Sequence, residues 1–269
     1  MPRRLRLDAE LVRRGLARSR EQATDLIAAG RVHVAGAVAT KAATGVTTDV
    51  ALVVRAGDDG RADFVSRGGH KLVGALTAFV PLGLQVAGRR ALDAGASTGG
   101  FTDVLLHHGV AAVVAVDVGY GQLAWALATD DRVHVLDRTN IRELAPGDLP
   151  YAPDLVVADL SFISLTKVLP ALVSLATECA DFVLMVKPQF EVGKDRVGKG
   201  GVVREAGLRA EAVLAVASAA RDLGLGVAGV TASPLPGPAG NVEYFCWLRA
   251  DAADVDMTTV ANVIAVGPQ

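Results

Sequence analysis

The stretch Leu92-Asp93-Ala94-Gly95-Ala96-Ser97-Thr98-Gly99-Gly100-Phe101 decides the fold of this 269-residue chain. An apolar run leads into a glycine-rich segment, and an amphipathic pattern follows, so a strand, a tight loop and a helix are predicted. Glycine lets a backbone adopt positive φ and approach a ligand closely. This order is typical of α/β proteins that bind a cofactor beyond the carboxyl end of a parallel strand.

Two cofactors compete for this loop. A dinucleotide-binding loop has the spacing G-x-G-x-x-G, whereas Gly95, Gly99 and Gly100 give G-x-x-x-G-G. Asp93 precedes the loop, where its carboxylate would repel a pyrophosphate and attract the ammonium of S-adenosylmethionine. Asp117 ends the next predicted strand and is placed to accept hydrogen bonds from a ribose diol. The charge argument favours S-adenosylmethionine over NAD, and a glycine turn without a ligand is the remaining alternative.

Outward from this loop, short β-rich runs alternate with helical patterns. This alternation predicts an α/β fold, a Rossmann-like and mostly parallel seven-stranded sheet covered by helices on both faces. The strands are expected near residues 90–93, 113–117, 133–136, 155–159, 182–187, 227–231 and 243–248. The helices are expected near residues 70–79, 99–107, 121–128, 164–177 and 205–222.

Charge is unevenly distributed along the chain, although the net charge is only −2. Residues 1–62 hold 11 Lys and Arg against 7 Asp and Glu, and the remainder holds 16 against 22. A basic module joined to an acidic one is expected when one end binds a polyanion. Within the basic part, Ser19-Arg20-Glu21-Gln22 is a capping box that begins a helix, and Gly30 ends it. Strands near 31–34 and 50–54 complete a small α+β domain.

Composition excludes several classes of protein. The chain is 51% hydrophobic and 21% charged, which is typical of a globular protein rather than a disordered one. The first residues lack the apolar stretch of a signal peptide, and the apolar tracts fall short of the 18 or so residues that span a bilayer. No Cys and His spacing suggests zinc. We expect a cytoplasmic protein with no stable membrane association and no metal.

Two predicted strands are each followed by a charged residue. Asp159 follows the run Leu155-Val156-Val157-Ala158, and Lys187 follows Val183-Leu184-Met185-Val186. The carboxyl ends of parallel strands meet at one edge of the sheet, so both side chains should face the same crevice as Gly95. An Asp in this position is often only a helix cap. A lysine that closes an apolar strand must instead extend into a polar cavity.

The N-terminal segment resembles the alpha-L RNA-binding motif over about residues 5–55, through the stretches 11–20 and 29–36. The resemblance implies that arginines in this segment contact phosphates, with Arg67 added just beyond it. An ordinary solvated arginine face is the alternative. The expected domains are residues 1–60 for RNA binding, a linker at 61–66 and a methyltransferase domain at 67–269. The expected RNA contacts are Arg4, Arg13, Arg14, Arg18, Arg20, Arg31 and Arg67.

Nearly the whole chain resembles the TlyA family, known as haemolysin A or rRNA 2′-O-methyltransferase, whose catalytic domain is similar to the FtsJ-type methyltransferases. The likeness is carried by residues 66–72, 95–101, 117–123, 157–164, 186–193 and 236–245. It implies transfer of a methyl group from S-adenosylmethionine to a cytidine 2′-OH in small-subunit ribosomal RNA, and in large-subunit RNA for longer members such as this one. The partner is therefore ribosomal RNA within ribosomal subunits.

The resemblance also assigns roles to single residues. FtsJ-type enzymes use a Lys-Asp-Lys-Glu tetrad, which falls on Lys71, Asp159, Lys187 and Glu243. Burial and a second ammonium both favour the neutral amine of Lys187, which would take the 2′-OH proton. Asp159 would orient Lys187, and Glu243 would anchor Lys71. The residues expected to bind the cofactor are Asp93, Gly95, Ala96, Ser97, Thr98, Gly99, Gly100, Phe101, Asp117, Val118, Asn140 and Asp159.

Two further function classes stay open from the sequence. One is a membrane-active haemolysin, the activity after which the family is named. No spanning segment and no strong basic amphipathic pattern supports it. The other is a non-catalytic RNA-binding factor for ribosome assembly, with an inactive methyltransferase fold. The presence of all four tetrad residues argues against that reading.

Overall fold

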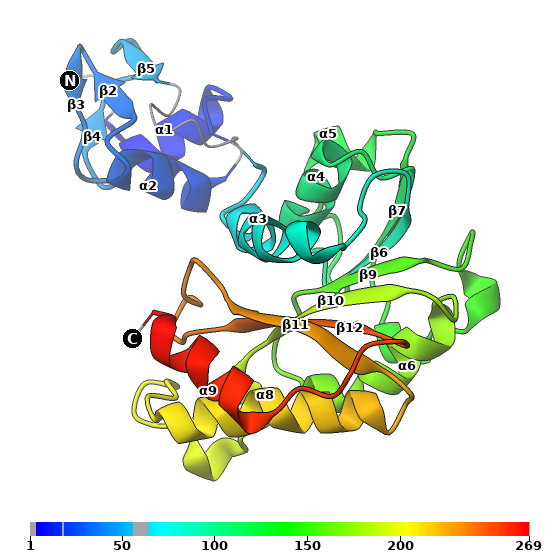
Figure 1. Ribbon diagram of the computed structural model, residues 1–269. Coiled ribbons are helices and arrows are strands. Elements are labelled where there is room, and N and C mark those ends of the chain that lie inside the picture. The colour runs from blue at the N-terminus through cyan, green and yellow to red at the C-terminus, as the bar shows by residue number, and fades with distance from the viewer. Residues whose placement is uncertain (1–3, 18, 56–63, 269) are drawn as a thin grey trace. The chain divides into compact units, whose positions relative to one another are not determined.

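Two units, residues 1–66 and 67–269, make up the computed structural model, which describes residues 4–17, 19–55 and 64–268 (Figure 1). The described residues of the first unit form two short helices and two small antiparallel sheets. Its helices are α1 (Leu7–Arg13) and α2 (Arg20–Ala28). Its strands are β1 (Leu5–Arg6), β2 (Val32–Val34), β3 (Ala37–Val38), β4 (Gly45–Val46) and β5 (Leu52–Val54).

The helix start predicted at Ser19 is confirmed. Ser19 is the N-cap of α2, and its side chain accepts a hydrogen bond from the Gln22 N–H. This interaction satisfies one of the backbone donors that a helix start leaves unpaired. An apolar core holds the helices and sheets of the unit together. It is formed by Leu7, Leu11, Ala17, Ala23, Ile27, Val32, Ala39 and Val46.

The second unit is built on one seven-stranded sheet with the order β11-β12-β10-β9-β6-β7-β8. Neighbours from β10 to β8 are parallel, and β12 runs antiparallel to both β10 and β11. The strands are β6 (Arg90–Ala94), β7 (Ala112–Val116), β8 (Val133–Leu136), β9 (Leu155–Ala158), β10 (Asp181–Val186), β11 (Gly226–Ala232) and β12 (Tyr244–Arg249). The prediction of a mostly parallel seven-stranded sheet is confirmed.

Helices cover both faces of this sheet. Figure 1 shows α3 and α4 on one face and α6 and α8 on the other. The helices are α3 (Gly68–Phe79), α4 (Gly100–His107), α5 (Trp125–Ala128), α6 (Leu169–Leu175), α7 (Pro188–Glu191), α8 (Ala206–Arg221) and α9 (Met257–Val266). Short 3₁₀ turns lie at Val80–Leu82, Ile141–Glu143, Pro146–Asp148, Leu165–Lys167 and Lys194–Arg196.

Four helices differ from the sequence prediction, among them the short α7, which was not expected. The helix expected at 121–128 is confined to α5, because residues 118–124 fold as a loop beside the glycine-rich segment. The helix expected at 164–177 is divided into a 3₁₀ turn and α6, which has a proline in its first turn. Helix α9 was not predicted, although Asp256 caps it by accepting a hydrogen bond from Thr259 N–H.

The sheet interior explains why the strands were readable from the sequence. Strands β9 and β10 are buried over their whole lengths. A parallel strand covered on both faces has no solvent side, so it appears as a continuous apolar run. Charged residues beside such runs can therefore lie only at the ends of the strands, and these ends form the candidate site.

Candidate active site

One edge of the sheet gathers four charged residues of the second unit. Asp159 follows β9, and Lys187 follows the neighbouring β10. Glu243 precedes β12, whose first residue, Tyr244, lies opposite Val186. Because β12 is antiparallel to β10, its beginning lies where β10 ends. Lys71 reaches the same edge from α3.

These four residues form two ion pairs, and we call them the quartet. Lys187 Nζ lies 2.5 Å from Asp159 Oδ1, and Lys71 Nζ lies 2.5 Å from Glu243 Oε2. Lys71, Lys187 and Glu243 are buried, at 5%, 7% and 1% exposure, while Asp159 is partly exposed. A charge removed from water needs a partner or further hydrogen bonds to be tolerated. Each lysine of the quartet has such a partner.

Neighbouring groups fix the Lys71–Glu243 pair. Gln189 Nε2 donates a hydrogen bond of 3.3 Å to Glu243 Oε1, and Lys71 Nζ lies 3.9 Å from Met185 Sδ. A Cβ at Gly237 would lie 2.5 Å from Glu243 Oε1. The carboxylate of Glu243 is therefore packed against backbone on one side and held by Gln189 on the other.

The glycine-rich loop passes close to Asp159. Gly95 has a φ of +86°, and a Cβ there would lie 2.9 Å from the Asp159 carbonyl oxygen. Gly99 has a φ of +97° and begins α4, and a Cβ there would meet the side chains of Leu123 and Leu127. Both positions require glycine for conformation and for space. The loop is thereby held against the strand end that carries Asp159.

Asp93 lies beneath this loop with no exposed surface. Its Oδ2 accepts a hydrogen bond of 2.7 Å from Thr102 Oγ1, whereas the buried Oδ1 has no partner among the described residues. Burial raises the pKa of Asp93 to about 7, opposed by the Thr102 hydrogen bond and reinforced by the charge of Asp159. A buried acceptor without a partner fits a site that receives a cation or an N–H donor.

The remaining predicted cofactor residues differ in what their side chains can offer. Asp117 accepts hydrogen bonds from Ser97 N–H at 2.8 Å and Gly119 N–H at 2.7 Å, which fixes its carboxylate. Val118 and Thr98 are exposed. The Asn140 side chain caps a 3₁₀ turn and pairs with Glu143. Ala96, Gly100 and Phe101 are buried, so any contact they make would be through the backbone.

Two residues between Asp159 and the next helix belong to the site but had no role in the sequence prediction. Lys187 Nζ donates a hydrogen bond of 3.0 Å to Ser161 Oγ. Phe162 is 92% exposed with a φ of +65°, and its ring centroid lies 5.4 Å from that of Phe190. An aromatic residue three positions after both Asp159 and Lys187 was a signal available in the sequence.

The predicted RNA-binding arginines of the first unit are largely engaged in ion pairs. Arg13 and Arg14 contact the buried Glu10, while Arg6 and Arg20 contact the buried Asp8. The hydrogen bonds from Arg6 and from Arg13 are the largest causes that lower the pKa of Asp8 and of Glu10, respectively, to about 2. Four guanidinium groups thus surround two carboxylates, which leaves an excess of positive charge.

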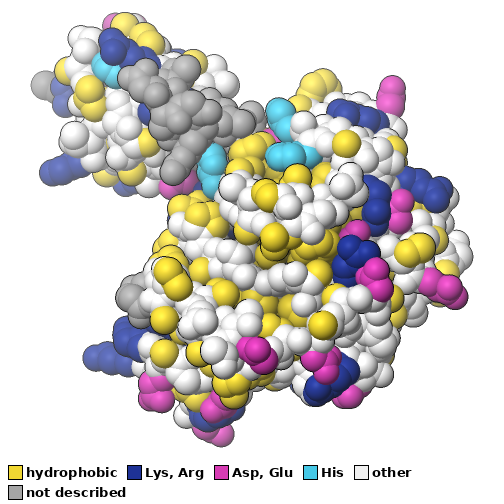
Figure 2. All heavy atoms as spheres, viewed as in Figure 1, with side chains coloured by type: hydrophobic (Ala, Val, Ile, Leu, Met, Phe, Trp, Pro, Cys, Tyr) yellow, Lys and Arg dark blue, Asp and Glu magenta, His cyan; other side chains and the backbone are white. Residues whose placement is uncertain are grey.

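Other arginines of the predicted set lie elsewhere. Arg4 is exposed, and Arg31 Nε donates to the Arg55 carbonyl at 2.9 Å. Arg67, in the second unit, donates to the Pro236 carbonyl at 2.8 Å. Arg18 lies outside the described residues. Figure 2 shows Lys and Arg side chains at several places on the visible face of the first unit.

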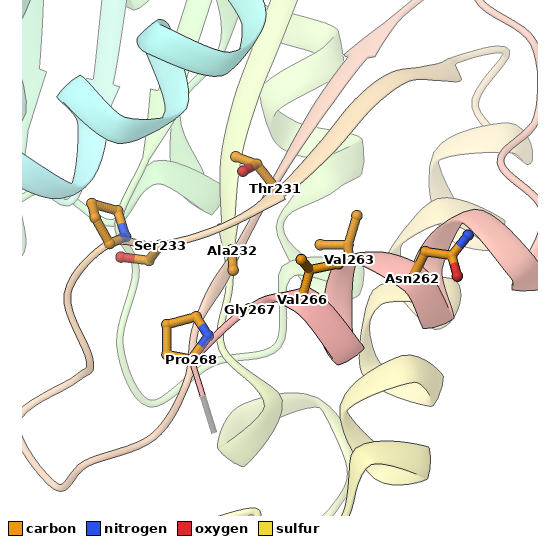
Figure 3. Close-up of a pocket in the computed structure, with 9 residues that line it drawn as sticks. Thr231, Ala232, Ser233, Asn262, Val263, Val266, Gly267 and Pro268 are labelled. Carbon is orange, nitrogen blue, oxygen red and sulfur yellow. The ribbon is translucent and has the colours of Figure 1, made fainter.

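A cavity of 440 Å³ opens between the end of β11 and helix α9 (Figure 3). Its lining is mostly apolar, and none of the quartet or of the glycine-rich loop is part of it. The lining residues are Thr231, Ala232, Ser233, Pro234, Asn262, Val263, Val266, Gly267 and Pro268.

Within residues 4–17, 19–55 and 64–268, no helix is both long and apolar enough to cross a membrane. Over the same ranges, no group of three or more His, Cys, Asp or Glu side chains is arranged to hold a metal ion.

Comparisons with known proteins agree with this architecture. Residues 64–250 match the FtsJ-like methyltransferase family, and residues 5–52 match the S4 domain. The chain is 64% identical over 249 residues to the 16S/23S rRNA (cytidine-2′-O)-methyltransferase TlyA of Mycobacterium tuberculosis, which covers 93% of this chain and 91% of that protein. It is 38% identical to hemolysin A of Brachyspira hyodysenteriae, over 89% and 98% of the two chains.

A solved structure extends the likeness to three dimensions. A Streptococcus thermophilus protein matches with a TM-score of 0.77 at 37% identity, over 98% of this chain and 96% of that one. The resemblances to a basic RNA-binding motif and to FtsJ-type enzymes are both confirmed. The chain belongs to the TlyA family, with an N-terminal S4 domain followed by an FtsJ-like methyltransferase domain.

Proposed function

We propose that this protein methylates the ribose 2′-OH of cytidine in 16S and 23S ribosomal RNA, with S-adenosylmethionine as the methyl donor. One observation carries the proposal: two buried lysines, each paired with a carboxylate, lie at the sheet edge where the glycine-rich loop meets Asp159. The relative from Mycobacterium tuberculosis, whose name states this activity, supports it at 64% identity. Because the substrate is ribosomal RNA, the proposed place of action is the cytoplasm.

The residues around the glycine-rich loop would hold the methyl donor. Asp93 offers a buried carboxylate oxygen that has no partner among the residues the structure describes, which suits the ammonium of the methionine moiety. Asp117 is held by two backbone N–H groups, and the second lone pair of each oxygen is available to a ribose diol. When bound, S-adenosylmethionine supplies an electrophilic methyl group.

Lys187 is the proposed proton acceptor. A ribose hydroxyl is a weak acid, and its oxygen becomes a better nucleophile as a base removes its proton. A neutral amine at Lys187 Nζ accepts that proton and becomes an ammonium ion beside Asp159, which stabilises the positive charge. Lys71, paired with Glu243, places a second positive charge at this edge, where it favours the developing alkoxide.

Phe162 is the proposed contact for the target base. Phe162 lies three residues after Asp159 and is almost fully exposed. Its ring contacts the ring of Phe190. A bulky residue with positive φ is strained, and such strain tends to persist where function requires it. Stacking on an aromatic ring is a common way for proteins to hold an unpaired base.

The two units divide the work in this proposal. Residues 1–60 would bind ribosomal RNA through the S4 domain. Residues 67–269 would bind the methyl donor and carry out the methyl transfer. The S4 match and the arginine excess around Asp8 and Glu10 support the first assignment. Phosphate contacts of this kind give binding that weakens as salt concentration rises.

Methyl transfer to isolated ribosomal subunits tests the function. Labelled S-adenosylmethionine is incubated with unmodified 30S and 50S subunits, and the modified nucleotide is mapped. The proposal expects a 2′-O-methylcytidine in each subunit with the wild-type protein and none with Lys187→Ala. Methylation of a base atom, or equal labelling by the variant, would overturn it.

Membrane activity is the second candidate, because a relative 38% identical to the chain is named hemolysin A. Release of dye from lipid vesicles measures it directly. Vesicle leakage by the wild-type protein that is retained in Lys187→Ala would establish an activity separate from methyl transfer. Intact vesicles at micromolar protein would remove this candidate.

A further inference from the structure

Two oxygen atoms lie close to Lys187 Nζ: one is its ion-pair partner in the quartet, and the other, outside the quartet, accepts a hydrogen bond from it. Its Nζ lies 2.5 Å from Asp159 Oδ1 and donates a hydrogen bond of 3.0 Å to Ser161 Oγ. Ser161 lies two residues after Asp159, on the loop that follows β9. Ser161 as a whole is exposed, yet its hydroxyl accepts a hydrogen bond from Lys187, a residue that is only 7% exposed.

The number of acceptors determines where the lone pair of the amine can point. A neutral primary amine carries one carbon, two hydrogens and one lone pair around nitrogen. When Asp159 and Ser161 each attract one N–H, both hydrogens are assigned and the lone pair is left with a single direction. With Asp159 alone, the amine can rotate about its Cε–Nζ bond and point a hydrogen toward the substrate instead.

From this geometry we propose that Ser161 is a positioning residue that aims the lone pair of Lys187 at the ribose 2′-OH, an inference that rests on the proposed function. In the step itself, the 2′-OH proton moves to Lys187 Nζ while the oxygen electron pair forms the new bond to the methyl carbon. The methyl–sulfur bond of S-adenosylmethionine would break at the same time, and its electron pair would leave with the sulfur of S-adenosylhomocysteine. The resulting ammonium has three N–H groups, directed to Asp159, to Ser161 and to the methylated oxygen.

The backbone holds Ser161 in place from both sides. Before it, Asp159 N–H donates to the Ala94 carbonyl at 3.1 Å, which ties the loop to β6. After it, the carboxylate of Glu191 accepts hydrogen bonds from Ser164 Oγ at 2.5 Å and from Leu165 N–H at 2.8 Å. The segment between these anchors is short and includes the strained Phe162. A hydroxyl held this way can fix a partner's direction without large entropic cost.

Single-turnover methyl transfer on ribosomal subunits tests this role with the full-length protein. Ser161→Ala is expected to lower the rate at saturation by about 10- to 100-fold, since a small misplacement of a reacting group can cost that much. The KM for RNA and the affinity for S-adenosylmethionine should stay within about twofold. Ser161→Thr keeps the hydroxyl on an exposed residue with room for a methyl group, and should recover most of the rate. Ser174→Ala removes an exposed helix hydroxyl that donates to the Ala171 carbonyl, and should match wild type.

A double-mutant comparison separates action through Lys187 from any other action. In a Lys187→Ala background, Ser161→Ala should not lower the rate of methyl transfer further, because the amine that Ser161 orients is absent. An equal loss in both backgrounds, an unchanged rate for Ser161→Ala, or no recovery with Ser161→Thr would overturn the positioning role. Full activity of the Lys187→Ala single variant would instead contradict the role of Lys187 as proton acceptor. Because Ser161 is unchanged in that variant, its result tests the proposed function separately from the positioning role.

Discussion

Lys71 and Glu243, which are 172 residues apart in the chain, form an ion pair with 2.5 Å between Lys71 Nζ and Glu243 Oε2. The pair joins helix α3 to the beginning of β12, and both side chains are almost completely buried. Neither charge can return to water without moving one of these elements. The site is therefore part of the structural framework of the second unit as well as its proposed chemical centre.

Removing Glu243 should destabilise the fold more than removing a surface carboxylate. Glu243→Ala leaves the buried ammonium of Lys71 without a partner, which typically costs about 3–5 kcal/mol of unfolding free energy. Glu211→Ala is the matched control, because Glu211 pairs with Arg196 while both are more than half exposed. Such pairs contribute less than about 1 kcal/mol. Denaturant unfolding measures both changes. An equal decrease in the free energy of unfolding for the two variants would show that the buried pair stabilises the fold no more than the exposed one.

Asp93 should make the free protein less stable as pH rises. Its pKa is about 7 in the fold against an ordinary value of 3.8, so the folded state holds the proton more tightly than the unfolded chain. The protonated form is present in both states at low pH, and stability is lost between pH ~4 and ~7, by roughly 4 kcal/mol in total. Asp93→Asn removes this loss. Urea unfolding at pH 5 and pH 8 should show a much smaller pH dependence for the variant than for wild type.

The same carboxylate should make cofactor binding depend on pH. Ionised Asp93 attracts an ammonium, so the affinity for S-adenosylmethionine should increase up to about pH 7 and then level off. Asp93→Asn should bind weakly, with no increase over that range. Calorimetric titration at several pH values measures this. If the affinity of the wild-type protein for S-adenosylmethionine did not change from pH 5 to pH 8, Asp93 would not be the residue that binds the ammonium.

Two arginines that look equivalent in the sequence should behave differently. The Arg14 guanidinium contacts Glu10 and donates to the carbonyls of Val50, Thr47 and Thr48, whereas Arg20 is 60% exposed and contacts Asp8. Arg14→Ala should therefore lower the stability of the first unit. Arg20→Ala should mainly weaken RNA binding and reduce its salt dependence by about one charge. Thermal unfolding and filter binding measure the two effects. A loss of stability in Arg20→Ala together with a loss of RNA binding alone in Arg14→Ala would contradict the structure.

Phe162→Gly should separate stability from activity. Glycine adopts a φ of +65° without strain, so the variant should be at least as stable as wild type. Loss of a stacking ring costs about 1–3 kcal/mol per base, which corresponds to a roughly 5- to 150-fold lower rate on ribosomal subunits. Cofactor affinity should not change. A variant with wild-type turnover would show that the ring does not hold the base.

Much of the fold could be predicted because it depends on local patterns. Buried parallel strands are continuous apolar runs, and all seven were placed to within about one residue at each end. Helix α9 was missed because its start signal is a single capping Asp256 after a polar turn. The division of the 164–177 helix depends on Pro170 and on a 3₁₀ turn, which propensity alone does not resolve.

Long-range relationships were harder to predict. The pairing of Arg20 with Asp8 and of Arg13 and Arg14 with Glu10 depends on how α1 and α2 pack, so a basic face was expected where ion pairs lie. The contact between Lys187 and Ser161 depends on the path of one loop. Phe162 lies within the 157–164 stretch that carries the family likeness, but its exposure and positive φ cannot be read from sequence.

Lys187 is the proposed proton acceptor, and Lys187→Arg tests this role most directly. Arginine keeps the positive charge but stays protonated, so it cannot act as a base near neutral pH. Single-turnover methyl transfer should fall by roughly 10²–10⁴-fold in both Lys187→Arg and Lys187→Ala, with the two rates within about tenfold of each other and cofactor affinity retained. Near-wild-type turnover by Lys187→Arg would contradict the account and leave this lysine with only an electrostatic role.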